Sequence, residues 1–160
     1  FDTAALEARK KALREMGVAP SRLYYASGSR GTQAGLTLGA KLCGAPYRVY
    51  GVAVSAGEPE KIERARRIAN EAATLLGLEE RLDLGDLFTD QGFIGEGYGI
   101  PTAASIEAQT LAARTVAIFV DHTYTAKALG AVIEMVRAGR FHPDQTVLFW
   151  HTGGQVGLFA

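Results

Sequence analysis

The residues best suited to chemistry form a stretch rich in glycine and hydroxyl groups, residues 26–35, with the sequence ASGSRGTQAG. It follows an apolar run, Leu23–Ala26, that predicts a buried strand, and it leads into Gln33–Cys43, which predicts a helix. Glycines let the backbone turn and approach a ligand closely, and the free N–H groups and dipole of a helix start attract anions. Further hydroxyl donors are Ser27, Ser29 and Thr32. A phosphate is the natural ligand of such a loop.

Two better-known phosphate motifs do not match this stretch. No Gly-Lys-Ser/Thr sequence closes it, as a Walker loop requires, and Gly28, Gly31 and Gly35 are wrongly spaced for the dinucleotide fingerprint. A strand-to-helix turn that binds nothing remains an alternative, because such turns are common in α/β proteins.

Three other loops carry polar or aromatic side chains: Asp121–Tyr124, His151–Gly154 and Gly95–Pro101. The first two follow the predicted strands Val116–Val120 and Thr146–Trp150. Ligands of parallel sheets bind beyond the carboxyl ends of the strands, where such loops meet. We therefore expect the first two loops to converge with residues 26–35 on one site, with the Gly95–Pro101 loop as a candidate fourth member.

The elements that position these loops alternate between strand and helix. Apolar periodicity and turn residues predict helices at Thr3–Met16, Gln33–Cys43, Pro59–Leu76, Thr102–Arg114 and Thr125–Ala138, and strands at Leu23–Ala26, Tyr47–Ser55, Val116–Val120 and Thr146–Trp150. Short strands at Leu82–Phe88 and Phe93–Ile94 are weaker candidates. The inner side of the fourth helix is expected to hold Ile106, Leu111 and Ala112. The pattern predicts an α/β fold in which residues 1–160 form a single domain, a parallel sheet with helices on both faces in three layers.

Length and composition exclude several classes of protein. The chain has 160 residues, enough for one domain with a real core, and its 17 basic residues balance its 17 acidic ones, so no nucleic-acid partner is expected. We expect no membrane helix and no signal peptide. The single cysteine, Cys43, is typical of a reducing compartment such as the cytoplasm. No metal is expected, because the histidines are not spaced as ligands.

Four of these segments follow one another in the order and at about the spacing of one enzyme family. Residues 26–35 resemble the phosphate loop of the pyridoxal-phosphate-dependent D-cysteine desulfhydrase and aminocyclopropane-carboxylate deaminase family, and Gly97–Pro101 resembles its tyrosine loop. Asp121–Ala128 resembles its Asp-Pro-Val-Tyr segment, and His151–Gly154 its final motif. The resemblance implies the type II pyridoxal-phosphate fold, similar to tryptophan synthase β, of which this chain would form most of the large domain.

The resemblance also implies roles for individual residues. The loop that would hold the phosphate of pyridoxal phosphate comprises Ser27, Gly28, Ser29, Arg30, Gly31 and Thr32. Tyr124 and Tyr98 would face the substrate, with Tyr124 as an acid, base or nucleophile. Thr125 and Thr152 would complete the cofactor site, with Thr152 at the pyridine nitrogen, where a hydroxyl suits elimination at the β-carbon.

Three positions depart from the family's pattern. Thr125 stands where the deaminases have Glu, which favours β-elimination from a D-cysteine-like amino acid to give pyruvate, ammonia and sulfide. L-cysteate sulfo-lyase and aminocyclopropane-carboxylate deaminase activities remain alternatives. Arg30 replaces a Gly, and it either strengthens the phosphate site, reaches an acidic substrate or points to solvent. His122 replaces a Pro and is expected to be an ordinary loop residue.

The lysine that would form a Schiff base with the cofactor is missing. In the family it lies upstream of these motifs, and no lysine here has a matching context: Lys10, Lys11, Lys41, Lys61 and Lys127. We therefore expect a portion of a longer two-domain enzyme, inactive alone. Its partners would be its own N-terminal half, a small amino-acid substrate and, in a homodimer, a second copy.

Two readings from other classes remain open. One is a non-catalytic module that binds a phosphorylated ligand, which the missing lysine favours. The other, weaker reading is a nucleotide-binding Rossmann-like domain, although no acidic residue follows the second strand as that fold requires.

Overall fold

The computed structural model describes residue 11 and residues 15–154, so the helix expected at Thr3–Met16 lies almost wholly outside the described residues. The elements in order are β1 (Pro20–Ser27), α2 (Gly31–Leu42), β2 (Arg48–Ala53), α3 (Glu60–Leu75), the 3-10 helix η1 (Leu84–Asp86), β3 (Phe88–Asp90), α4 (Ala103–Val116), α5 (Thr125–Arg137) and β4 (Thr146–Phe149). The four strands form one parallel sheet in the order β3-β2-β1-β4. The predicted α/β fold is therefore confirmed.

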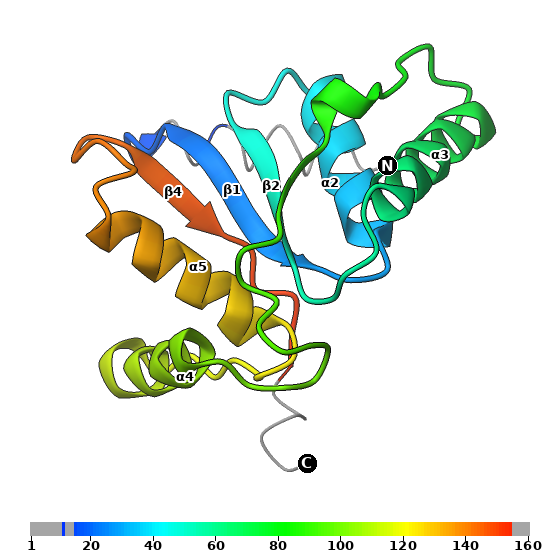
Figure 1. Cartoon of the computed structure of the whole chain (residues 1–160). Coiled ribbons are helices and arrows are strands. Elements are labelled where there is room, and N and C mark those ends of the chain that lie inside the picture. The colour runs from blue at the N-terminus through cyan, green and yellow to red at the C-terminus, as the bar shows by residue number, and fades with distance from the viewer. Residues whose placement is uncertain (1–10, 12–14, 155–160) are drawn as a thin grey trace.

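Helices cover both faces of this sheet (Figure 1). α2 and α3 lie on one face, while α5 lies on the other and carries α4 on its outer side. Along β1, Leu23 and Tyr25 pack toward α2, and Tyr24 and Ala26 pack toward α5. All four side chains are buried, which explains why a strand covered on both faces has a continuous apolar sequence.

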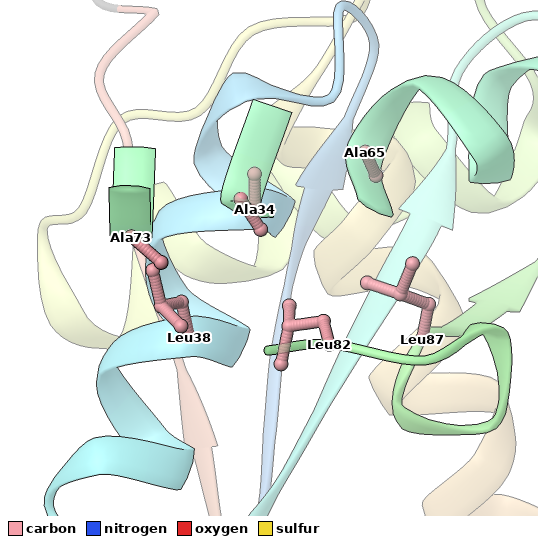
Figure 2. Packing of buried hydrophobic residues seen from close by; sticks show 7 residues of the cluster. Ala34, Leu38, Ala65, Ala73, Leu82 and Leu87 are labelled. Carbon is pink, nitrogen blue, oxygen red and sulfur yellow. The ribbon is translucent and has the colours of Figure 1, made fainter. Parts of the chain in front are cut away.

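Small residues let α2 and α3 approach each other closely (Figure 2). The cluster between them comprises Ala34 and Leu38 of α2, Ala65, Ala69 and Ala73 of α3, and Leu82 and Leu87 of the following segment. Each is at most 6% exposed. Because this cluster fixes the first turns of α2, it also fixes the loop that precedes that helix.

An aromatic row crosses the α5 face of the sheet. Tyr24 of β1 pairs in register with Tyr50 of β2 and with Phe149 of β4, and Tyr50 pairs with Phe88 of β3. The rings of Tyr24 and Tyr50 stack with centroids 5.1 Å apart. A cavity of about 780 Å³ opens beside this row, toward the end of α5, and its lining includes no residue of the loops singled out above.

The strand expected at Val116–Val120 is wrong. Val116 still belongs to α4, whose C-cap is Ala117 in the left-handed conformation with φ 54°. The N–H of Ile118 then donates to the carbonyl of Ala112, which closes the helix end, and residues 118–120 join no described strand. The helix end was missed because an alanine occupies the left-handed position that usually requires glycine.

Other expectations also need correction. Leu82–Phe88 contains η1 and only the first residue of β3. Phe93 lies in a turn and Ile94 in no regular element, so neither belongs to a strand. Ile106 and Leu111 are 51% and 41% exposed. The buried face of α4 consists of Ser105, Ala108 and Ala112.

β4 lies at an edge of the described sheet, where it pairs with β1. Its four residues are only partly buried, and just beyond it the N–H of Trp150 donates to the carbonyl of Tyr24 at 2.8 Å. His151 Nε2 lies 2.9 Å from the carbonyl oxygen of Phe119, so the segment before Asp121 lies beside this end of β4. The side chains of Ile118, Phe119 and Trp150 remain between 42% and 48% exposed. In the described part of the chain, no helix has the length and apolar character needed to cross a membrane.

Candidate active site

The loop between β1 and α2 presents a helix start with donors available for an anion. Within the described residues no side chain caps α2, and its first turn holds no acidic residue, so its first N–H groups and the positive end of its dipole remain available. Ser29, Gly31 and Thr32 are exposed at this loop. The donor set therefore suits a phosphate group.

Ser27 and Arg30 lie beneath this loop rather than on its surface. Their exposed fractions are 2% and 1%. Ser27 Oγ accepts hydrogen bonds from Tyr25 and Arg30, and it donates to Gln33 Oε1 at 3.2 Å. The Ser27 hydroxyl is thus engaged inside the protein. The alternative that Arg30 points to solvent is wrong. Its side chain has polar partners on β1, on α2, on β3 and in the segment before α3.

Two tyrosines from distant loops meet beside this loop. The hydroxyl groups of Tyr98 and Tyr124 are hydrogen-bonded to each other, and their rings meet edge to face with centroids 5.7 Å apart. A Cβ atom built on Gly28 would lie 3.3 Å from Cε1 of the Tyr124 ring. The absence of a side chain at Gly28 therefore lets Tyr124 approach the first loop, and three predicted site residues are brought together.

The tyrosine pair has an altered acidity. The hydrogen bond with Tyr98, followed by desolvation and by the nearby groups Tyr98 and Asp121, raises the pKa of Tyr124 to about 12. Tyr124 is therefore protonated at neutral pH. In this state the hydroxyl can donate a hydrogen bond and cannot act as a general base.

Asp121 orders the turn that carries Tyr124. Its Oδ2 accepts the N–H groups of Thr123 and Tyr124 at 3.0 and 2.9 Å, and its Oδ1 accepts the N–H of Thr125 at 2.9 Å. The carboxylate thus satisfies donors at the start of α5, as an N-terminal cap does. This holds the backbone of Tyr124 in place next to the first loop.

Thr125 and Thr152, both predicted to contact the cofactor, have different surroundings. Thr125 is 1% exposed, and its hydroxyl donates to Asp121 Oδ1 at 2.7 Å and accepts the N–H of Asp121 at 2.9 Å. Thr152 is exposed. The two segments meet nonetheless, since the carbonyl of Gly153 lies 3.3 Å from the Thr125 hydroxyl, and a Cβ on Gly154 would collide with the Asp121 carboxylate.

Lys127 fixes the loop that carries Tyr98. Its side chain is 1% exposed, and its Nζ donates to the carbonyl oxygens of Ile94 and Gly97 at 2.7 and 2.8 Å. Burial lowers the pKa of this amine. Gly97 directly precedes Tyr98 and Ile94 begins the same loop, so a buried cation on α5 positions the tyrosine loop beside the start of that helix.

Sequence reasoning missed several residues that hold the site. Glu58 and Thr89 contact Arg30, and nothing in their spacing signals this, because β3 and the segment before α3 meet the loop only in the folded chain. Asp121 was noted only as part of a loop. An Asp shortly before a helix is a recognised helix-start signal, so its capping role was accessible from sequence.

The fold and the site together define a pyridoxal-phosphate-dependent enzyme domain. A family model described as "Pyridoxal-phosphate dependent enzyme" matches residues 1–153, and the chain belongs to this family. The chain is 33% identical over 146 residues to 1-aminocyclopropane-1-carboxylate deaminase of Burkholderia ambifaria, covering 91% of this chain and 43% of the relative. It is 34% identical over 157 residues to D-cysteine desulfhydrase of Salmonella paratyphi C, covering 98% of this chain and 46% of the relative.

A solved structure agrees with these relatives. The crystal structure of an ACC deaminase homologue superposes with a TM-score of 0.75 at 28% identity, covering 88% of this chain and 41% of that one. The type II pyridoxal-phosphate fold is thereby confirmed, as is pyridoxal phosphate as the cofactor of the family. The chain spans less than half the length of the curated relatives that it matches.

Proposed function

We propose that this chain supplies the phosphate-binding loop and the substrate-facing tyrosines of a pyridoxal-phosphate-dependent lyase acting by β-elimination on a cysteine-like amino acid. The observation that carries the proposal is the hydrogen-bonded pair Tyr98–Tyr124, set against Gly28 of the anion-binding loop. When bound, pyridoxal phosphate supplies the electron-withdrawing ring that weakens bonds at the α-carbon of an amino acid. The exposed tyrosine hydroxyls stand beside the loop that would hold its phosphate.

Residues of this chain would bind the cofactor and assist the departure of the leaving group. Ser29, Thr32 and the first N–H groups of α2 would hold the phosphate, with the Ser27–Arg30 network supporting the loop from below. Tyr124, kept protonated by its raised pKa, would donate a hydrogen bond to the departing sulfur, and Tyr98 would position that hydroxyl. For D-cysteine the balanced reaction takes up one water and gives pyruvate, ammonia and sulfide.

The second half of the active site would come from the remainder of a longer protein. Each lysine among the described residues is engaged within the chain: Lys11 with Glu15, Lys41 with Asp86, Lys61 with Ser55, and Lys127 as above. Relatives are more than twice as long, and the apolar side chains beside the β4 edge are exposed. We infer that an N-terminal half carries the cofactor-binding lysine and covers this edge, in a protein that forms homodimers as the family does.

Substrate and product analysis of the intact protein tests the activity. Purified protein with pyridoxal phosphate is offered D-cysteine, L-cysteate and 1-aminocyclopropane-1-carboxylate in turn. Sulfide release from D-cysteine supports the proposal, sulfite release identifies the cysteate activity, and ammonia without a sulfur product identifies the deaminase. Cofactor binding without turnover of any of these would contradict the lyase and favour a binding module.

A chemical map of the lysines tests the missing half. The 160-residue chain and the intact protein are each treated with pyridoxal phosphate and borohydride, and modified lysines are located by mass spectrometry. We expect one stoichiometric adduct upstream of this chain in the intact protein. A single stoichiometric adduct within the chain, for instance at Lys127, would overturn the proposal.

A further inference from the structure

Arg30 has an uncommon position in the loop between β1 and α2. It precedes the first residue of α2 with φ 78°, in the left-handed region, which side chains other than glycine, asparagine and aspartate rarely adopt. Its side chain is nevertheless almost fully buried. A charged side chain is buried in such a place only when partners compensate its charge and its donors.

The guanidinium of Arg30 joins four parts of the fold. Nη1 donates to Ser27 Oγ at the end of β1 at 3.0 Å, to Gln33 Oε1 in the first turn of α2 at 2.8 Å, and to Thr89 Oγ1 of β3 at 3.2 Å. Nη2 forms an ion pair with the carboxylate of Glu58, just before α3. The anion-binding loop is thereby tied to three elements and to the connection that leads into α3.

Glu58 has a second contact that holds it in this position. Its Oε2 accepts the N–H of Ile62 in the first turn of α3 at 3.0 Å, and its side chain is 7% exposed. Glu58 thus satisfies a donor at the start of α3 while it neutralises Arg30. If the loop moved outward with Arg30 and Glu58 still paired, the hydrogen bond between Glu58 and the N–H of Ile62 would break.

The positive charge of Arg30 is therefore neutralised inside the protein. Because Glu58 cancels it, the attraction of the loop for an anion rests on the N–H groups of α2 and the hydroxyls of Ser29 and Thr32. We propose that Arg30 is a positioning residue of the anion-binding loop and that Glu58 is the counter-ion that keeps its guanidinium beneath the loop. This inference rests on the cofactor site of the proposed function.

The proposal predicts opposite effects for the two halves of the ion pair. Arg30→Met removes the hydrogen bonds that join the loop to Ser27, Gln33 and Thr89. It also leaves the carboxylate of Glu58 buried without its counter-ion, and this negative charge repels a phosphate. Glu58→Gln keeps the Arg30 bonds to Ser27, Gln33 and Thr89 but leaves an uncompensated cation beneath the loop. A role in stability alone would weaken folding in both variants without changing the preference for a phosphorylated ligand.

The experiment measures dissociation constants of pyridoxal phosphate and of pyridoxal, which lacks the phosphate, on the intact protein that contains this chain. Their ratio isolates the contribution of the phosphate from general damage. We expect Arg30→Met to lower the preference for pyridoxal phosphate by about tenfold or more, the effect of losing one charge-assisted interaction. Glu58→Gln should raise it, and the surface variant Lys41→Met should leave it unchanged.

A double variant keeps the test decisive if a single variant fails to fold. Arg30→Met/Glu58→Leu removes both charges together, and buried ion pairs often tolerate such apolar replacement. It should fold, as judged by circular dichroism, yet show a lower preference than wild type because the tie is lost. A folded double variant with an unchanged ratio, or equal losses in both single variants, would overturn the inference while the cofactor site stands. A wild-type protein without preference for pyridoxal phosphate would instead overturn the cofactor site and this inference with it.

Discussion

The ammonium group of Lys127 lies 2.7 Å from the carbonyl oxygen of Ile94, in the loop that leads to Tyr98. A residue on α5 thus sets the position of a side chain that is more than half exposed. Lys127→Met would keep the length of the side chain but leave the carbonyls of Ile94 and Gly97 without their donor. An unpaired carbonyl that is shielded from water costs about 1–3 kcal/mol, and these two carbonyls are partly buried, so the loop should open locally.

Hydrogen exchange measures this effect directly. We expect faster exchange over residues 94–101 in Lys127→Met and a lower kcat in the intact enzyme, while Lys41→Met, at a surface ion pair with Asp86, should match wild type. Unchanged exchange in this loop would show that Lys127 does not hold it.

The tyrosine pair predicts a specific titration. The hydrogen bond with Tyr98 is the first cause of the raised pKa of Tyr124, so Tyr98→Phe should move that pKa down, toward the ordinary value of about 10. The ultraviolet absorbance of the phenolate, followed against pH, reports the change. A Tyr124 titration that stays near pH 12 in Tyr98→Phe would show that the hydrogen bond with Tyr98 does not cause the raised pKa.

Alkaline pH should also reduce stability. A pKa raised to about 12 in the folded chain means that the native state holds this proton more tightly than the unfolded state. The contribution is fully present below about pH 10 and is lost as pH rises toward 12. Burial raises the pKa of Tyr25 in the same direction. Urea midpoints should therefore fall between these pH values, and a flat profile would contradict the shifts.

Gly28 and Gly39 form a matched pair of substitutions. Gly28→Ala would place a methyl group 3.3 Å from the Tyr124 ring and 3.5 Å from Val54 Cγ2, which should displace the tyrosine and lower kcat by about tenfold, equivalent to ~1.4 kcal/mol. Gly39→Ala on α2 meets no atom within 4 Å and should stabilise the helix by about 0.5–1 kcal/mol. Thermal melts and steady-state kinetics separate the two outcomes, and equal kcat values would sink the proposed packing role of Gly28.

Asp121→Asn tests the turn before α5. The amide retains one acceptor oxygen but loses the charge that holds three N–H groups and the Thr125 hydroxyl. Loss of a helix cap costs about 0.5–2 kcal/mol, so the urea midpoint should fall. Asp144→Asn, at an exposed site beside His142, is the control and should have little effect. Equal stability of both variants would argue against the cap.

The strands of this fold were readable from sequence where both faces are covered. β1 and β2 are buried against α2 on one side and α5 on the other, and such strands have continuous apolar sequences. The same criterion failed at residues 116–120, which are also apolar. There Ala117 ends α4 in the left-handed conformation, and no glycine marks this helix end in the sequence. The segment that follows has no strand partner in the described part of the chain.

The candidate site divides in the same way. The loop, Tyr98 and Tyr124 were found because their motifs are contiguous, and the structure brings Gly28 and both tyrosines together. Glu58 and Thr89 were not found because their link to Arg30 spans elements that are distant in sequence. Contacts of that kind depend on how α3 and β3 pack, which local periodicity does not determine.

The single tryptophan of the chain has a use that follows from its place at the end of β4. Trp150 is 46% exposed and immediately precedes His151, while its N–H is anchored to the carbonyl of Tyr24. Its fluorescence is therefore an intrinsic probe of this corner of the molecule. If another part of the protein buried the β4 edge, the emission of Trp150 would shift to the blue. A bound pyridoxal group, which absorbs in the emission range of tryptophan, would quench this emission by energy transfer. One optical signal could thus follow assembly and cofactor loading without any added label.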